Sequence, residues 1–451
     1  MPILRSAHIR RGSLFAVAIA ILIGVGSVAN SGGFHSAPGS APAAISRTTP
    51  VSDQAPAISN ASCSAGACHG SPATDSLVGV KPIARMWHRS ASHWQAADPH
   101  AGAYALLTDK PNRPVTVSAE SMLLRLGVNG PARNEVRCLV CHTDPALTSP
   151  RAGIAADLME HLRSDGVGCQ ACHGRAETWL VPHTAGTLAG MTPLRAVVDR
   201  AQVCAGCHIG APASEALPAR QVDHDLLAAG HPRLTYDFAE HHRRLPKHWT
   251  EKAPGANFEI RLWLVGQVVE AEAVCRQLAD RAAQGAWPEL AEFRCAACHH
   301  DLAGESRDSP IGYLRWRSSW YLLTTGGSHP PLDALLEMMN GRKRPQPDVV
   351  RTAAEKALAE LKLRRAVIAA TADAELPQLL RAALAAAPAG IIDGEDLVSL
   401  LQAMAAWERN RKVAAADPAD FEAAYESARK REWKELKRRL DGLLLRLQQA
   451  E

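Results

Sequence analysis

The feature that most constrains this chain is a short motif of cysteine and histidine that recurs along it. The pattern C-x-x-C-H occurs four times in a chain with only 11 Cys and 19 His, and a form with four residues between the cysteines occurs once. Two thiols at this spacing with a histidine directly behind are typical of covalent haem attachment, in which the imidazole ligates iron. The strict copies are Cys138, Cys141 and His142; Cys169, Cys172 and His173; Cys204, Cys207 and His208; and Cys295, Cys298 and His299; the wider copy is Cys63, Cys68 and His69.

Two other uses of paired cysteines explain the motif less well. A structural zinc site has four ligands and does not need a histidine after every second cysteine. Disulfides within C-x-x-C loops are strained and leave the repeated histidine unexplained. The sequence therefore predicts about five covalently bound haem c groups, with these ten cysteines as attachment points and the five histidines as proximal ligands.

The N-terminal segment predicts export. Residues 1–29 contain Arg5, Arg10 and Arg11, then an apolar run, then Ser27-Val28-Ala29, which is typical of a cleaved secretory signal. The expected location is therefore the periplasm, where haem c is attached. The apolar run from Leu14 to Val28 is short for a membrane span, but an uncleaved segment that anchors the protein is the alternative.

The composition of the chain bears on its partners and on its core. The formal charge of +4 falls to +1 without the three signal arginines, so no nucleic-acid partner is indicated. Aromatic residues make up 5% of the chain, which is few for a protein core, and we expect haems to replace them as buried apolar groups. The eleventh cysteine, Cys275, lies in an apolar helical pattern over 259–284 and is expected to be a buried thiol; an intermolecular disulfide or a reactive thiol is the alternative.

Two strings resemble a known family. The run DGVGCQACHG at 165–174 and the run DPHAGA at 98–103 are similar to segments of the multihaem c-type cytochrome family that includes the tetrahaem electron carrier of the hydroxylamine-oxidation pathway. The resemblance covers roughly residues 61–302. It implies that His100 is a distal ligand, that His183 is the distal ligand of the haem on Cys63, Cys68 and His69, and that the haem on Cys138, Cys141 and His142 is five-coordinate. The fifth motif, at Cys295, departs from the tetrahaem pattern.

The remaining distal ligands are expected from the residues themselves. His224 and His231 are seven residues apart, so on one helix they share a face two turns apart, and we expect both to be distal ligands. Asp223 and Asp225 are expected to hold a ring N–H. His241, His242 and His248 are alternatives to either histidine, whereas His88, His93 and His161 are expected to be ordinary polar side chains and His300 no ligand to its own iron.

The predicted fold is all-α. Residues 1–29 are the signal segment, 30–60 a flexible linker, 61–330 a pentahaem cytochrome c domain wrapped around stacked haems, and 331–451 a haem-free C-terminal helical bundle. Within the first domain, one helix is expected over 86–107. In the bundle, Asp348 is expected to cap a helix, and a last helix begins at Asp417-Pro418. The run 313–321 either covers a haem edge, with Arg315 and Arg317 on propionates, or packs in the core.

Two function classes follow from the count of axial ligands. An iron held by two imidazoles transfers electrons, whereas an iron that lacks a distal ligand binds small substrates. The leading hypothesis is an exported cytochrome that passes electrons between redox partner proteins. The alternative is an oxidoreductase that acts on a small nitrogen or sulfur compound at an open haem. A third hypothesis is that the C-terminal bundle makes the protein a subunit of a membrane-bound respiratory complex.

Overall fold

The computed structural model describes residues 58–70, 86–108, 111, 114–148, 154–214, 217–252, 254–299, 314–317, 329–386, 394–409, 418–430 and 432–449. The expected signal segment, most of the expected linker, His300 and the aromatic residues Tyr313, Trp320 and Tyr321 lie outside these residues.

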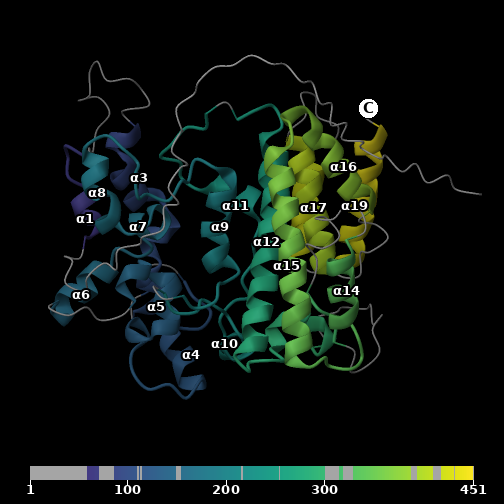
Figure 1. The fold of residues 1–451 in the computed structure, drawn as a ribbon, viewed down its shortest axis with the longest axis horizontal. Coiled ribbons are helices and arrows are strands. Elements are labelled where there is room, and N and C mark those ends of the chain that lie inside the picture. The colour runs from purple at the N-terminus through teal and green to yellow at the C-terminus, as the bar shows by residue number, and fades with distance from the viewer. Residues whose placement is uncertain are drawn as a thin grey trace, which may run out of the picture. The chain divides into compact units, whose positions relative to one another are not determined.

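The all-α prediction is confirmed (Figure 1). In the described part of the chain, the only extended pairings are two isolated bridges, Ala211 with Arg220 and Phe293 with Trp316. The helices are α1 (Asn60–Cys63), α3 (Ser90–Ala97), α4 (Ala119–Arg125), α5 (Val136–His142), α6 (Ala156–Arg163), α7 (Cys169–His173), α8 (Ala176–Thr184), α9 (Val197–His208), α10 (His224–Ala229), α11 (Phe238–Arg244), α12 (Phe258–Ala283), α14 (Pro330–Met339), α15 (Pro347–Ala370), α16 (Leu376–Ala386), α17 (Gly394–Arg409), α18 (Pro418–Arg429) and α19 (Trp433–Gln449).

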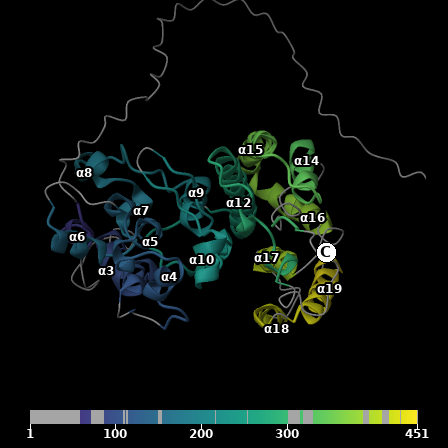
Figure 2. The ribbon, with the colours of Figure 1, turned by 90° about the horizontal axis from the view of Figure 1, so that it is seen from below.

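Helix α12 lies at the centre of the largest hydrophobic core. It packs against α9 and α11 and, over most of its length, against α15 (Figures 1 and 2). It is apolar on most of its circumference, as expected of a helix that is buried on all sides. Cys275 is fully buried in it, as expected, and burial raises the pKa of this thiol. The same cluster of buried side chains runs from Ala201 on α9 to Leu443 on α19, so residues before and after 330 share one core.

The C-terminal helices differ from the sequence prediction in two details. Asp348 does not cap α15: the N-cap is Gln346, Pro347 occupies the first turn, and Asp348 lies one residue inside the helix. The expected last helix is two helices, α18 and α19, which pack against each other, so its apolar stripe is divided between them. Phe421 on α18 and Leu436, Leu440 and Leu443 on α19 are buried.

The single helix expected over 86–107 is wrong. Helix α3 ends at Ala97, and the 3-10 turns η1 (Pro99–Gly102) and η2 (Tyr104–Leu107) follow it. Pro99 disfavours a helical conformation at Asp98 and has no N–H to continue the α3 ladder. Asp98 is extended and caps the turn, accepting a hydrogen bond from the backbone N–H of His100 at 3.0 Å. This break sets His100 apart from α3.

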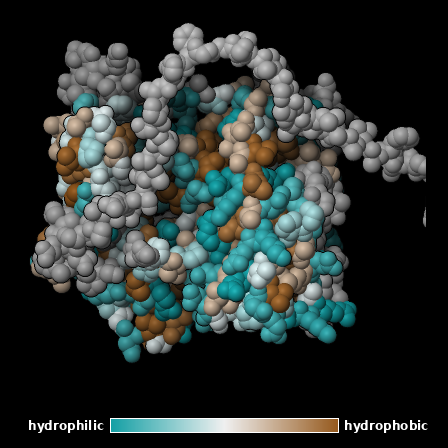
Figure 3. Space-filling view, in the orientation of Figure 1, coloured by the Kyte–Doolittle hydropathy of each residue, from teal (hydrophilic) through white to brown (hydrophobic). Residues whose placement is uncertain are grey.

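On the face of the molecule in Figure 3, hydrophobic residues occur in patches among hydrophilic ones. Leu363 and Val367, neighbours on one face of α15, are exposed, and an exposed apolar pair of this size is found on most proteins. Across the residues that the structure describes, no helix has the length and apolar character that crossing a membrane requires.

Candidate haem-binding sites

Each strict motif but the last lies at the C-terminal end of a helix. Helices α5, α7 and α9 end at His142, His173 and His208, so the two cysteines of each motif are one turn apart on one face. At the fifth motif a 3-10 turn, η6 (Cys295–Ala297), is closed by a hydrogen bond from His299 N to Cys295 O at 2.8 Å.

The wider first motif is closed in the same way. Helix α1 ends at Cys63, and the four intervening residues form turns that bring His69 back, with its N–H 3.1 Å from Cys63 O. The longer loop therefore forms the same closure between the first cysteine and the histidine as the fifth motif.

The five motif histidines each face a second histidine from a distant part of the chain. Ring centroids are 5.8 to 6.5 Å apart in all five pairs. The pairs are His69 with His183 (5.8 Å), His142 with His231 (6.5 Å), His173 with His248 (6.1 Å), His208 with His100 (6.2 Å) and His299 with His224 (6.4 Å).

This separation fits a metal held between two imidazoles. Metal to imidazole bonds are about 2 Å long, and a ring centroid lies roughly 1 Å behind its nitrogen, so two axial rings have centroids about 6 Å apart. Direct ring contact is closer: His241 lies 4.6 Å from His208. The geometry therefore fits His100, and not His241, as the ring across an iron from His208.

Four of the paired rings have their Nδ1 atoms hydrogen-bonded. His69 Nδ1 lies 2.7 Å from Trp87 O, His142 Nδ1 lies 2.9 Å from Ala103 O, and His231 Nδ1 lies 2.8 Å from Pro232 O. His100 Nδ1 lies 2.8 Å from the carboxylate of Asp98, a bond that raises the pKa of His100. Donation from Nδ1 leaves Nε2 as the ligating nitrogen, which is how outer partners orient metal-bound histidines.

Asp98 therefore holds a histidine ring N–H, the role that the sequence predicted for Asp223. Asp223 instead caps α10, accepting from Leu226 N at 2.8 Å. The helix ends at Ala229, and Gly230 is left-handed with φ +115, so His231 lies beyond the helix and not on its face. The expectation of two histidines on one helix face is wrong, because α10 is too short; the two rings face different motifs.

Burial keeps several of these rings neutral. It lowers the pKa of His173 to about 4, helped by the nearby rings of His248 and His69, and lowers that of His208 to about 4 as well. The pKa values of His183, His231 and His248 are also lowered, mainly by burial. Neutral imidazole is the form that ligates metals.

The sequence string DGVG has a structural reason. Gly166 has φ +70, and a Cβ there would lie 2.5 Å from His100 O, so a side chain is excluded. The next residue, Val167, donates its N–H to His100 O at 3.0 Å. Asn60 on α1 accepts from Cys169 N at 3.0 Å. The string thus joins the third motif both to the first motif and to the segment that carries His100.

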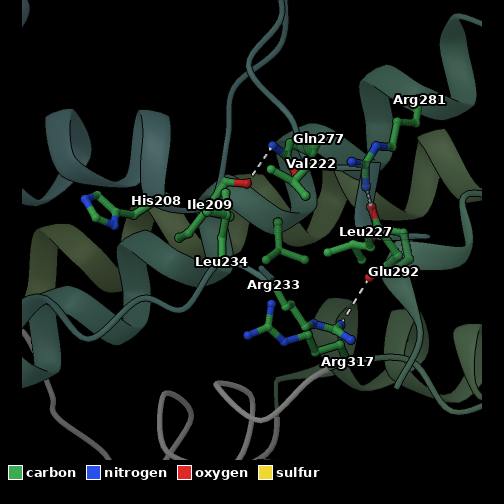
Figure 4. A pocket seen from close by; sticks show the side chains of 12 residues that line it. His208, Ile209, Val222, Leu227, Arg233, Leu234, Gln277, Arg281, Glu292 and Arg317 are labelled. Carbon is green, nitrogen blue, oxygen red and sulfur yellow. Dashed lines mark hydrogen bonds and ion pairs between the residues drawn. The ribbon is translucent and has the colours of Figure 1, made fainter. Parts of the chain in front are cut away.

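A cavity beside His208 of the fourth motif is lined by both apolar and charged side chains. Figure 4 shows apolar Ile209, Val222, Leu227 and Leu234 between His208 and the ion pair of Arg281 with Glu292, with Arg233 and Arg317 nearby. Arg233 also contacts Cys295 Sγ at 2.5 Å. Apolar walls with arginines at the edge fit an apolar macrocycle that carries anionic propionates. The neighbouring Trp316 is 1% exposed and donates to Glu292 at 3.2 Å, so this residue of the aromatic run packs in the core.

The other described histidines face no motif ring at this spacing. His93 and His161 are exposed, and His88 Nδ1 lies 3.0 Å from Cys68 O. None of the 11 cysteines forms a disulfide. Across the described part of the chain, no three His, Cys, Asp or Glu side chains converge as a structural zinc site requires. His248 was only one of three alternatives from sequence, because no helical pattern or motif distinguishes it from His241 and His242.

Comparison with known proteins gives one match. Residues 86–174 match the family model described as cytochrome c554 and c-prime; the matched range includes Asp98 to Ala103 and ends with the DGVGCQACHG string. No curated protein and no solved structure matches the chain. The match supports a c-type cytochrome, a class of electron-transfer protein that binds haem c covalently.

Proposed function

We propose that this protein is an exported pentahaem c-type cytochrome that transfers electrons between redox partner proteins, with every iron held between two histidines. The proximal ligands are His69, His142, His173, His208 and His299, and the distal ligands, in the same order, are His183, His231, His248, His100 and His224. The attachment cysteines are the ten of the five motifs. When bound, haem c supplies a one-electron couple, and an iron with two axial imidazoles exchanges electrons without a vacant position for substrate.

The five imidazole pairs are the observation on which this proposal rests. One pair at about 6 Å has little weight alone, but all five motif histidines have such a partner. The chain thus offers two ligating nitrogens to each iron, and for four of these rings a bond at Nδ1 sets the orientation.

His231 favours the carrier over the small-molecule oxidoreductase. The resemblance implied an open iron at His142, and an enzyme of this kind needs one. His231 faces His142 at 6.5 Å, and its ring is held by the carbonyl of Pro232. A ring in this place excludes substrate from the distal side of the second haem.

Short segments connect the motifs, which supports electron transfer among closely spaced haems. The segment from Asp98 to Leu107 carries His100, which faces the fourth motif, and Ala103, whose carbonyl holds His142 of the second. Val167, just before the third motif, bonds to the same segment. Helix α10 begins with His224, facing the fifth motif, and leads to His231, facing the second.

Export and redox partner proteins complete the proposal, and membership of a membrane respiratory complex is the alternative to a freely diffusing carrier. Export is supported by residues 1–29 of the sequence, and periplasmic location follows from it. Co-purification from membranes at low and high salt separates a bound subunit from a freely diffusing carrier.

Carbon monoxide tests the central claim. The mass of the intact holoprotein gives the number of bound haems. The protein is then reduced and exposed to carbon monoxide while its visible spectrum is recorded. We expect five haems and no spectral change, because a distal imidazole blocks each iron. A colourless protein without added porphyrin mass contradicts the cytochrome assignment. Carbon monoxide binding to one haem contradicts the fully closed set and favours the oxidoreductase.

A further inference from the structure

The distal histidine of the third motif is in edge-on contact with a tryptophan, as His183 is with Trp179 at 5.6 Å. His248 lies in the irregular segment after α11, and its ring contacts two rings: His173 at 6.1 Å and Trp249 at 5.2 Å. The planes of His248 and Trp249 are 83° apart, so the contact is edge-on. For His100 and His231, by contrast, a carboxylate or a carbonyl fixes the ring through Nδ1.

Trp249 is itself fixed by a charged cluster. Its Nε1 donates to Glu251 Oε1 at 2.7 Å, and the guanidinium of Arg200 lies 5.7 Å from the ring centroid. Arg200 pairs with both carboxylate oxygens of Glu251, one of them at 3.1 Å. His242 Nε2 lies 3.0 Å from Arg200 Nη1 and 3.2 Å from Glu251 Oε1.

The cluster joins His248 to another motif. Arg200 is a buried residue of α9, the helix that ends with Cys204, Cys207 and His208. The ion pair of Arg200 with Glu251 therefore fixes the His248 segment to the helix that carries the fourth motif. Interactions with Arg200 and Trp249 lower the pKa of Glu251 to about 2, and burial lowers that of His242 to about 4, so near neutral pH the cluster is one cation, one anion and a neutral ring.

We propose that Trp249, held by Glu251 and Arg200, is a positioning residue for His248, and that this cluster sets the orientation and reduction potential of the third haem site alone. The proposal rests on the ligand assignment made above. Outer-shell groups that orient a metal-bound imidazole tune the metal. At His248 an edge-on indole takes the place of the Nδ1 hydrogen bond that orients His100 and His231, and the charged cluster fixes that indole.

Three substitutions separate the effect of ring orientation from the effect of charge. Trp249→Ala removes the ring contact and keeps the ion pair, whereas Trp249→Phe restores an aromatic edge without the N–H. Glu251→Gln keeps an acceptor for Trp249 and removes the negative charge. Glu426→Gln is the control, because Glu426 also pairs with arginine, but on α18. All are made in the full holoprotein.

The readouts are low-temperature electron paramagnetic resonance and a redox titration. We expect Trp249→Ala to change the signal of one low-spin haem, Trp249→Phe to restore most of it, and Glu251→Gln to raise one midpoint potential. The control should leave both unchanged. Unaltered spectra and potentials in Trp249→Ala and Glu251→Gln, with five haems present by mass, overturn the positioning role.

Failure of the function assignment looks different from this. An unsubstituted protein without haem, or one in which His248→Gly does not open an iron to carbon monoxide, contradicts the ligand assignment itself. If Glu251→Gln does not fold, Trp249→Ala and Trp249→Phe still test the positioning role, because both keep the ion pair of Arg200 with Glu251. Unaltered spectra in the folded Trp249→Ala variant then count against the proposal.

Discussion

The imidazole of His231 faces that of His142 with ring centroids 6.5 Å apart, although His142 ends α5 and His231 follows α10. Under the proposed function, His231 is the sixth ligand of the iron that the family resemblance leaves open. The choice between an electron carrier and an oxidoreductase therefore depends on His231, and substitution of this residue tests it.

Replacing His231 should open one haem. In His231→Gly, the reduced protein is expected to bind carbon monoxide at one of five haems, because the iron on His142 loses its second imidazole. The absorbance change at saturating carbon monoxide, divided by the haem count, gives the fraction of haems that bind the gas. His161→Gly is the control, since His161 is exposed and faces no motif ring. Carbon monoxide binding by unsubstituted protein at the same fraction refutes the role of His231.

Removing the carboxylate beside His100 should raise one potential. Asp98 bonds to the ring of His100 at 2.8 Å and is 8% exposed. A carboxylate at Nδ1 makes the imidazole a stronger donor to iron and favours the oxidised state. Asp98→Asn is therefore expected to raise one of five midpoint potentials in a redox titration. Asp225→Asn, an exposed acid beside His224, should change none; equal shifts in the two variants contradict the prediction.

The Arg200 and Glu251 pair should make stability fall in acid. The pKa of Glu251 is lowered from 4.5 to about 2, so its stabilising effect is complete above the unfolded value of 4.5 and is lost as pH falls towards 2. Because Glu251 is only partly buried, solvent screening reduces the stabilisation that this shift represents to about 1–2 kcal/mol. Urea unfolding of the parent and of Glu251→Gln, followed from pH 7 to pH 3, should show a constant difference above pH 5 that shrinks below it. A difference independent of pH contradicts this account.

Breaking the buried ion pair between α12 and α15 should be costly. Glu272 is 1% exposed and accepts from Arg365 Nε at 2.6 Å, with Arg276 farther away at 3.8 Å. Arg365→Met leaves a buried carboxylate without its nearer partner, which typically costs about 3 kcal/mol of unfolding free energy.

Lys437→Met on α19 is the matched control. Its ion pair with Asp441 is exposed on both sides and should contribute less than about 1 kcal/mol. Urea unfolding midpoints of the two variants compare their losses of stability. Equal losses would contradict a stabilising effect of Arg365 on the buried carboxylate of Glu272.

Much of the chemistry was determined by local sequence. The five motifs, with their ten cysteines and proximal histidines, depend on residues within seven positions of one another, and helices such as α12 and α15 follow from local periodicity. The resemblance likewise pointed to His100 and His183, both of which face a motif ring.

Only the tertiary structure decided which imidazole faces which. His183 lies opposite His69, and His248 opposite His173, across separations in sequence at which spacing has no predictive value. Local contacts also mattered: the side chain of Asp223 caps α10 by accepting from Leu226 N, and does not bond to a ring, while Glu289 accepts from His224 N. Ligand pairing is a long-range property, since it depends on packing of whole segments, and no local pattern encodes it.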